Sequence, residues 1–268
     1  MIYCNFLTTL DFAISPVCYD VLADMDQQYA HILLQDIKES FKPMSREFEQ
    51  KHLEQLLVPL AKFHSSFWEH EILAKPELGV PHTNSLRFPQ ALPVGYVHGN
   101  SASILQSILP EVRRVLGDYL PPKWGDLFQL IGEQWPSVFS SRIESAKDLT
   151  LIHGDLNWQN IFLACADDRV MLIDWECCKV GLSAFDLAYL LISSRSTRNR
   201  RRLEANAISF YRKQLCKHGV NFEEESFNYD YRLAIVMVLL VSITWLRVSA
   251  INDAMTAFED WDCGRLFV

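Results

Sequence analysis

The sequence is poor in basic residues relative to acidic ones. Its 268 residues include 25 lysines and arginines against 33 aspartates and glutamates, which gives a formal net charge of −8. A general nucleic-acid-binding protein needs a basic surface, so this class is excluded and no nucleic-acid partner is expected. The charge mildly favours a neutral or cationic substrate, although net charge says little about any one pocket.

A long apolar run and a leader segment are also missing. The most apolar segment, residues 233–246, contains only two polar residues and is bracketed by Arg232 and Arg247. It is shorter than the roughly 18 residues that a membrane-spanning helix needs, so we predict a buried helix and no membrane partner. The N-terminus has no basic segment followed by an apolar stretch, and no signal peptide is therefore predicted.

Paired cysteines are lacking as well. The cysteine count is odd, and no C-x-x-C spacing occurs. This pattern favours buried, reduced thiols in a cytoplasmic protein over a disulfide framework. The seven cysteines are Cys4, Cys18, Cys165, Cys177, Cys178, Cys216 and Cys263.

The patterns that are present predict an α+β fold. Residues 17–37 are rich in β-branched and aromatic residues around a turn, DMDQQ. The runs LTLI, NIFLA and VMLID, between residues 149 and 174, predict short strands with CADDR as a hairpin turn. Residues 75–100 are expected to be irregular. Helices are predicted at 45–70 with Ser45 as N-cap, 101–118, 123–145, 184–194, 198–217 with His218-Gly219 as C-cap, and 228–258.

The segment HGDLNWQN, residues 153–160, carries the clearest chemical signal. Asp155 and Asn160 lie five residues apart, and Asp174 follows in IDWE after the predicted hairpin. Phosphoryl transfer needs a carboxylate that orients the acceptor hydroxyl and oxygen ligands for a metal that neutralises phosphate charge. Magnesium takes few protein oxygens and completes its coordination with phosphate and water. One Asp, one Asn and a second Asp fit these requirements.

The same spacing resembles the catalytic loop and D-F-G aspartate of protein kinases. Here Gly154 replaces the arginine of H-R-D, and Asp174-Trp175-Glu176 replaces D-F-G. These replacements are similar to the small-molecule branch of the kinase-like fold, which includes aminoglycoside phosphotransferases, choline kinases and ecdysteroid-kinase-like proteins. The segments LAKFHSSFW (residues 60–68) and VGLSAFDLA (residues 180–188) extend the resemblance, which runs from about residue 17 to the C-terminus.

The resemblance implies a protein-kinase-like fold with a partial N-terminal β lobe, residues 1–37, and a large, mostly helical lobe, residues 38–268. It implies ATP and Mg²⁺ as cofactors and a small-molecule hydroxyl as acceptor, in a pocket formed by residues 71–145 and the C-terminal helices. The site residues that it implies are Asp155 as the catalytic carboxylate, His153 and Asp186 as braces of the catalytic loop, Asn160 and Asp174 as metal ligands, and Leu34, Gln35, Asp36 and Ile37 as the adenine-binding hinge.

The sequence motifs of the ATP-binding N-terminal half of a kinase are not found in this sequence. That half would supply a glycine-rich loop, a strand lysine and a helix glutamate, but the first such residues are Gly79, Lys38 and Glu39, beyond or at the hinge. A truncated gene product and a natural short form both explain this, and we expect truncation. The alternative function is a catalytically impaired pseudokinase that acts as a binding module.

Several other features have two interpretations. Asp155 and Asn160 could merely cap loop turns, and His98-Gly99-Asn100 resembles H-G-D but lacks the carboxylate and metal pair. The arginines at 195, 198, 200, 201 and 202 form either a phosphate or nucleic-acid site or, as we expect, the solvated start of a helix. One of Asp253, Glu259, Asp260 and Asp262 could contact a cationic substrate.

Overall fold

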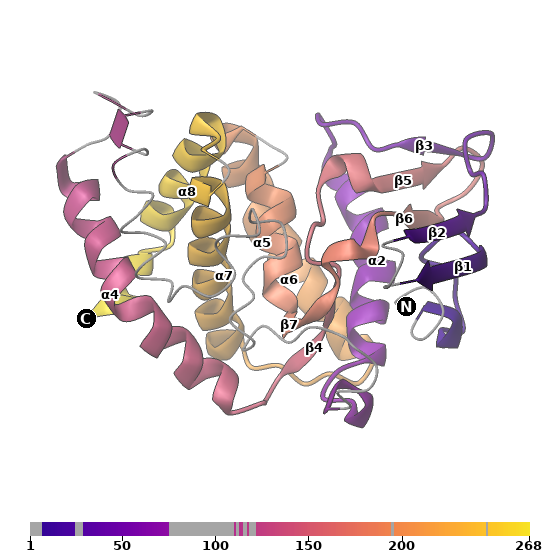
Figure 1. The fold of residues 1–268 in the computed structure, drawn as a ribbon, viewed down its shortest axis with the longest axis horizontal. Coiled ribbons are helices and arrows are strands. Elements are labelled where there is room, and N and C mark those ends of the chain that lie inside the picture. Colours follow the sequence, from indigo (N-terminus) through magenta and orange to yellow (C-terminus); the bar gives the residue numbers. More distant parts are fainter. Residues whose placement is uncertain are drawn as a thin grey trace.

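The computed structural model describes residues 7–24, 29–74, 110, 113–114, 117, 122–193, 196–244 and 246–268. Within these residues, two of the three small antiparallel sheets lie at one end of the molecule and a group of packed helices lies at the other, with the third sheet, Leu149–Ile152 paired with Lys179–Leu182, between them (Figure 1). The predicted α+β architecture is therefore confirmed. The helix predicted at 101–118, the irregular segment 75–100 and the H-G-D-like residues 98–100 lie outside the described residues or almost entirely so.

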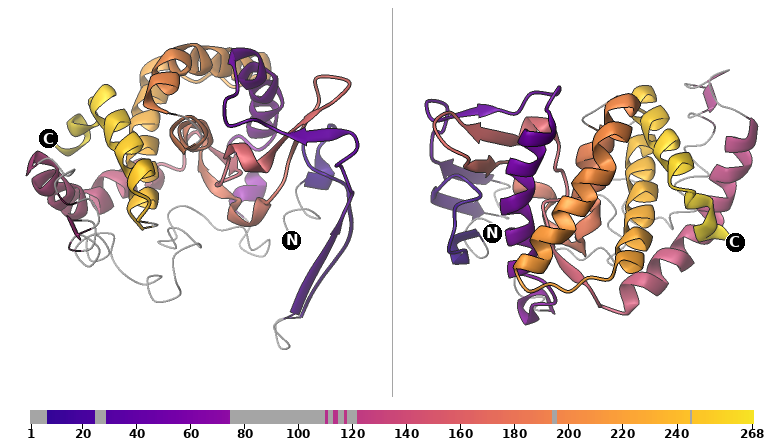
Figure 2. Two further views of the ribbon diagram at one scale, coloured as in Figure 1. Left: turned by 90° about the horizontal axis from the view of Figure 1, so that it is seen from above. Right: turned by 180° about the vertical axis from the view of Figure 1, so that it is seen from behind.

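The N-terminal sheet is a single hairpin of β1 (Cys18–Asp24) and β2 (Tyr29–Leu34), as predicted from residues 17–37. Val21 faces Ile32 across the antiparallel register. Figure 2 shows the hairpin extending away from the helical body. Apolar side chains such as Tyr19 and Leu33 are consequently 64% and 55% exposed. The division into lobes at residues 37 and 38 stays a prediction.

Two further sheets form around the H-G-D segment. The predicted hairpin is present as β5 (Ile161–Ala164) and β6 (Val170–Leu172), and the predicted strand LTLI is β4 (Leu149–Ile152). Two strands were not predicted: β3 (Phe41–Pro43), which pairs with β5, and β7 (Lys179–Leu182), which pairs with β4. The polar segment 38–43 gave no local strand pattern, because its partner lies more than a hundred residues away in the sequence.

The first long helix, α2 (Gln50–Ser66), begins later than predicted. Glu49 is its N-cap and forms a reciprocal capping box with His52. The proposed N-cap, Ser45, instead accepts a hydrogen bond from the Glu47 amide in a local turn (3.1 Å). The backbone of Met44 is bonded to Ile161 (2.8 Å), which keeps the chain extended past Ser45. Tertiary pairing with β5 thus delays the helix.

The remaining helices build the large lobe. The predictions at 123–145, 184–194 and 198–217 are confirmed by α4 (Pro122–Glu144), α5 (Ser183–Ser193) and α6 (Thr197–Lys217). The predicted C-cap is also present, since Gly219 adopts φ +86°.

The prediction of a single helix at 228–258 is wrong. The structure has two helices there, α7 (Glu224–Thr244) and α8 (Val248–Asp260), which pack on each other. Leu246 has φ +50° at the reversal, without a glycine or proline that would signal it. Short 3₁₀ segments complete the described chain at η1 (Leu7–Thr9), η2 (Glu71–Ala74), η6 (Trp158–Asn160), η7 (Trp175–Cys177) and η8 (Cys263–Phe267).

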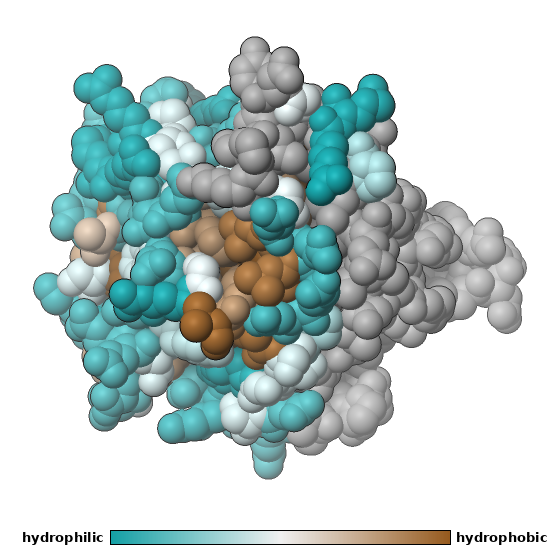
Figure 3. All heavy atoms as spheres, turned by 90° about the vertical axis from the view of Figure 1, so that its left-hand side faces the viewer, coloured by the Kyte–Doolittle hydropathy of each residue, from teal (hydrophilic) through white to brown (hydrophobic). Residues whose placement is uncertain are grey.

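Helix α7 is the centre of the hydrophobic core, as predicted for residues 233–246. By length and composition α7 could cross a membrane, but 78% of its most apolar 18-residue stretch is buried inside the fold. The C-terminal segment covers the core from the side on which α4 lies, where Phe258 stacks on Phe267 (6.4 Å between ring centroids). On this face, apolar side chains gather at the centre and hydrophilic ones surround them (Figure 3).

The six described cysteines are all free thiols, but the prediction that they are buried is wrong for Cys165 and Cys216, which are exposed. The six are Cys18, Cys165, Cys177, Cys178, Cys216 and Cys263. Burial raises the pKa of Cys177 to about 11, and burial also raises the pKa of Cys178. The two neighbouring thiols are therefore protonated at neutral pH and contribute as small apolar groups.

A buried ion pair ties α4 to α7. The Arg142 guanidinium donates two hydrogen bonds to the Asp230 carboxylate (2.6 and 2.7 Å), and it also bonds the Lys147 carbonyl (2.8 Å). The side chains are 12% and 2% exposed. Burial raises the pKa of Asp230 despite the adjacent guanidinium. Because a buried charge is costly without its partner, the planar fork of Arg142 is structurally important.

We expect Arg142→Lys to lower the free energy of unfolding by about 1–3 kcal/mol, because an ammonium cannot reproduce the two-pronged contact. Urea denaturation measures this change. Arg201→Lys is the matched control, since Arg201 makes an equally two-pronged contact to Asp260 (2.8 Å for both bonds) but is 55% exposed. Its loss should be about 0–1 kcal/mol. Equal losses in the two variants would contradict a dependence on burial.

Candidate active site

The H-G-D loop follows β4 and packs against η7. Gly154 has φ +82°, and a Cβ atom at this position would lie 2.2 Å from the carbonyl oxygen of Cys177. Real Cβ atoms essentially never come within 3.0 Å of such an atom. The obstacle is backbone, which cannot swing aside as a flexible side chain would. Glycine is therefore required here, which explains why the arginine of the protein-kinase motif is absent.

Asp186, in the first turn of α5, holds the loop backbone. Its carboxylate accepts hydrogen bonds from the amides of His153 (2.7 Å) and Gly154 (2.9 Å). The side chain is fully buried, and His64 from α2 contacts it at 3.2 Å. Burial favours the neutral acid, but the hydrogen bonds from His64 and the amide outweigh it and hold the pKa of Asp186 below its ordinary value. The ionised carboxylate thus binds two successive amides of the loop, while the functional role that the resemblance implied for Asp186 stays a prediction.

His64 extends these hydrogen bonds and was not singled out by sequence reasoning. Its second ring nitrogen lies 2.5 Å from the Tyr211 hydroxyl of α6, and Thr150 of β4 donates to its carbonyl (2.6 Å). All three side chains are buried. Its place in the segment LAKFHSSFW belonged to the family resemblance, but a histidine on the apolar face of a helix most often marks an ordinary core residue. The network connects α2, β4 and α6 to the loop.

His153 connects the loop to the end of β6. Its Nε2 lies 2.8 Å from the Ile173 carbonyl oxygen, and its ring packs against Trp175 (4.6 Å between centroids). Burial lowers the pKa of His153, so the imidazole is neutral. Nε2 then donates to Ile173 while Nδ1 accepts from the Asp155 amide (3.3 Å). Both ring nitrogens are therefore engaged by the backbone of the loop and of the segment after β6, while the role of His153 in the site stays a prediction.

Asp155 and Asn160 lie in direct contact. The Asn160 amide nitrogen donates to the Asp155 carbonyl (2.9 Å) and to its carboxylate (3.1 Å). Asn160 is 7% exposed, whereas Asp155 is only partly buried. The 3₁₀ turn η6 follows Asp155 in the sequence and ends at Asn160, and it brings the two residues together. Its N-cap, Asn157, accepts a hydrogen bond from the Gln159 amide. Because the amide nitrogen of Asn160 is directed at Asp155, its carbonyl oxygen is the atom available to a metal.

A backbone hydrogen bond brings the segment that contains Asp174 next to Asn160. The Asn160 carbonyl accepts a hydrogen bond from the Ile173 amide (3.0 Å), next to Asp174. Asp174 has φ +63°, a left-handed conformation that aspartate tolerates better than most residues, and its side chain is exposed. The described residues contain no group of three or more His, Cys, Asp and Glu that could hold a metal. The oxygens of Asn160 and Asp174 fit magnesium, which needs few protein ligands.

The proposed hinge, residues 34–37, follows β2 and leads to β3. The Gln35 amide donates to the Val17 carbonyl (2.8 Å), and the Ile37 carbonyl accepts from the amides of Ser40 and Phe41. Asp36 is exposed and pairs with Lys38 (2.8 Å). These bonds do not engage the Ile37 amide or the Gln35 carbonyl. The structure gives no contact between these four residues and Asp155, Asn160 or Asp174, so their role stays a prediction.

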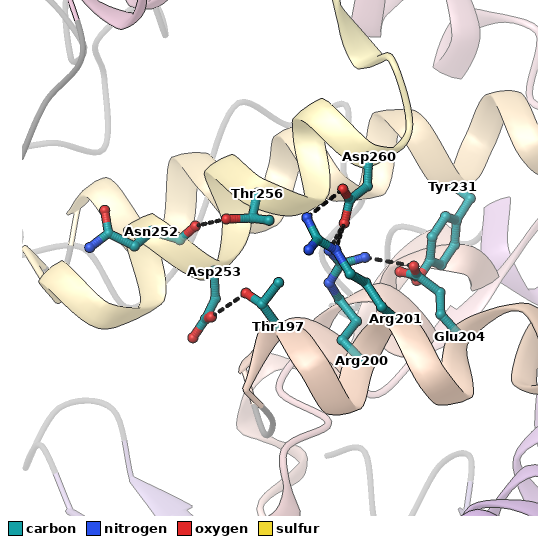
Figure 4. Close-up of polar contacts among 9 residues, drawn as sticks. All are labelled: Thr197, Arg200, Arg201, Glu204, Tyr231, Asn252, Asp253, Thr256 and Asp260. Carbon is teal, nitrogen blue, oxygen red and sulfur yellow. Dashed lines mark hydrogen bonds and ion pairs between the residues drawn. The ribbon is translucent and has the colours of Figure 1, made fainter.

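The arginine cluster and the late acidic residues engage one another. Arg200 and Arg201 of α6 both bind Asp260 of α8, and Arg200 also binds Glu204, which accepts from Tyr231 (Figure 4). Arg200 is 1% exposed, so the expectation of a solvated helix start is wrong for this residue. It is correct for Arg198, Arg201 and Arg202, which are exposed, while Arg195 lies outside the described residues.

The four acids named as candidate substrate contacts all have other partners. Asp260 is held by two arginines, and Asp262 pairs with Arg265. Asp253 accepts a hydrogen bond from Thr197 (2.8 Å), and burial raises the pKa of Asp253. Glu259 also has an interaction partner. These contacts give the acids a structural explanation that the sequence did not reveal.

The chain matches the model of the ecdysteroid kinase-like family over residues 5–221. Among solved structures, an ethanolamine kinase from Plasmodium vivax superposes with a TM-score of 0.55 at 16% identity, covering 97% of this chain and 70% of that one. The choline kinase of Streptococcus pneumoniae gives 0.50 at 15% identity, covering 92% and 75%. A variant of aminoglycoside 2'-phosphotransferase-IIIa bound to GDP gives 0.51 at 16% identity, covering 98% and 80%.

At this identity the solved structures establish the fold, which is the predicted protein-kinase-like one. No curated protein shows significant similarity to the sequence. The family match covers most of the chain, including β1 to α6 and the whole of the H-G-D loop. The chain belongs to the ecdysteroid kinase-like family.

Proposed function

We propose that this protein transfers the γ-phosphoryl group of ATP to a hydroxyl group of a small molecule. The observation that carries the proposal is the contact between Asp155, Asn160 and the backbone next to Asp174, on a loop braced by buried side chains. The names of the similar structures support it, since they include choline, ethanolamine and aminoglycoside kinases. One of them is a complex with AMP and another a complex with GDP.

In this proposal each residue has a separate task. The Asp155 carboxylate accepts or orients the proton of the acceptor hydroxyl, and Asn160 keeps that carboxylate in place (3.1 Å). The carbonyl oxygen of Asn160 and the carboxylate of Asp174 hold Mg²⁺, which neutralises charge on the phosphate oxygens when bound. Backbone groups of the hinge, Leu34 to Ile37, bind adenine. Residues 1–37 act as a partial small lobe and residues 38–268 as the large lobe.

A second candidate is a nucleotide-binding or partner-binding module without turnover. The observation in its favour is that β1 and β2 contain no lysine that could contact the phosphates of a nucleotide. Metal-dependent phosphate transfer distinguishes the two functions, because a binding module would not need an acceptor-orienting carboxylate.

Two measurements test the proposal: calorimetric titration with ATP and an assay of phosphate release from ATP. Each is made once with magnesium and once with EDTA. We expect binding and release of inorganic phosphate from ATP only when the metal is present, because Asn160 and Asp174 offer metal ligands rather than cationic phosphate ligands. ADP with magnesium serves as the product control. Nucleotide binding that is equal with magnesium and with EDTA would contradict the assigned metal site, and binding without turnover would favour the second candidate.

A further inference from the structure

Tyr189 lies at the catalytic carboxylate although no motif includes it. It follows Asp186 by three residues on α5, and residues at this spacing share one face of a helix. Asp186 binds the amides of His153 and Gly154, and the Tyr189 side chain, on the same face, interacts with the carboxylate of the next loop residue, Asp155. Burial and the neighbouring Asp155 charge raise the pKa of Tyr189 above its usual range. The phenol is therefore protonated at neutral pH and can act as a hydrogen-bond donor.

The Tyr189 ring is held in position by its surroundings. It stacks on Phe185, one turn earlier, with 5.6 Å between centroids and 29° between planes. Phe185 is 1% exposed and contacts the Lys179 ammonium (5.2 Å to its ring centroid). The hydroxyl of Ser193 donates to the Tyr189 carbonyl, which fixes the end of the helix. A stacked ring on a braced helix loses little further freedom when its hydroxyl contacts a partner.

We propose that Tyr189 is a positioning residue that donates a hydrogen bond to the Asp155 carboxylate and holds it toward the acceptor hydroxyl. Asn160 donates to the same carboxylate (3.1 Å), so Tyr189 and Asn160 together restrict its orientation. This inference rests on the proposed phosphoryl transfer. Charged or titratable groups near the pair include Lys179 of β7, Cys177 of η7, Arg247 before α8 and His153 of the loop.

Tyr189→Phe isolates the hydroxyl, because the ring and its stack on Phe185 remain. Its effect is measured in a double-mutant cycle with Asp155→Asn, using release of radiolabelled phosphate from Mg-ATP with water as the acceptor. We expect Tyr189→Phe to lower kcat about tenfold, less than loss of the carboxylate itself, with KM for Mg-ATP unchanged. In the Asp155→Asn background the same change should have no further effect, because the phenol acts only through that carboxylate.

Tyr231→Phe is the matched control. Tyr231 is also buried and donates to a carboxylate, that of Glu204 (2.9 Å), but far from the H-G-D loop in the α6–α7 packing. It should lower Tm without changing kcat. A kcat loss from Tyr189→Phe that is equally large in the Asp155→Asn background would overturn the positioning role, as would a loss confined to KM.

A second measurement separates this inference from the proposed reaction. In protein labelled at the tyrosine Cζ carbon, Asp155→Asn should shift the Tyr189 resonance, whereas Glu204→Gln should shift only that of Tyr231. The resonances are assigned by their disappearance in the two Tyr→Phe variants. If wild-type protein releases no phosphate from Mg-ATP, the proposed function fails, but the NMR spectrum still tests the contact between Tyr189 and Asp155. A Tyr189 resonance that does not shift in Asp155→Asn would overturn the inference about Tyr189.

Discussion

Asp155→Asn is expected to lower turnover of Mg-ATP by about 10²- to 10⁴-fold, the usual contribution of a general base. Binding of Mg-ATP should stay within about twofold of wild type, because the carboxylate acts on the acceptor and not on the metal. The asparagine side chain keeps the size of the carboxylate and can still accept from Asn160, whose amide donates to it in the wild type (3.1 Å). The loop geometry should therefore survive while the proton acceptor is lost.

Asp174→Ala should give the opposite result and abolish the magnesium dependence of nucleotide binding. Asp174 is exposed and has a left-handed backbone conformation just after β6, so its side chain makes no contribution to the core, and the proposed function makes its carboxylate a metal ligand. Asp167→Asn is the matched control, an exposed aspartate at the opposite end of the same β5–β6 hairpin that bonds only Arg169 in the described structure. Calorimetry and phosphate release measure both effects. Equal loss of nucleotide binding in the Asp155 and Asp174 variants would mean that the two roles are assigned wrongly.

The second large effect is expected from Gly154→Ala. A methyl group there would meet the Cys177 carbonyl oxygen at 2.2 Å and its carbon at 2.9 Å. To relieve this overlap, the loop must separate from η7 and lose amide bonds to Asp186. We expect the free energy of unfolding to fall by about 4 kcal/mol or more, in the range that marks a specific steric defect. Turnover should fall at least about a hundredfold, because Asp155 moves with the loop.

Gly219→Ala separates the clash from the backbone conformation. Gly219 has φ +86°, close to the +82° of Gly154, but nothing lies within 4 Å of a Cβ built on it. Its substitution should cost only the left-handed strain of about 1–2 kcal/mol and leave turnover intact. Urea denaturation of the two variants gives the difference directly. If both glycines cost the same, the loop is not packed against η7 as the structure shows.

The sequence by itself determined the features that depend on local pattern and spacing. Alternating and β-branched residues predicted the β1–β2 and β5–β6 hairpins, and helical periodicity predicted α4, α5 and α6. The motifs at 153–160 and 173–176 identified the family resemblance and the three residues that the structure brings together, Asp155, Asn160 and Asp174. These succeed because five residues and one short hairpin separate the groups, so local geometry alone places them side by side.

Only the tertiary structure decided the features that depend on distant partners. β3 and β7 exist because they pair with β5 and β4, and α7 and α8 separate because the chain reverses at Leu246 without a local signal. The burial of Arg200 follows from Asp260, sixty residues away. His64 of α2 is linked to the H-G-D loop through Asp186, and Tyr189 of α5 interacts with Asp155. No sequence period encodes such contacts, because the side chains meet only after the helices have packed.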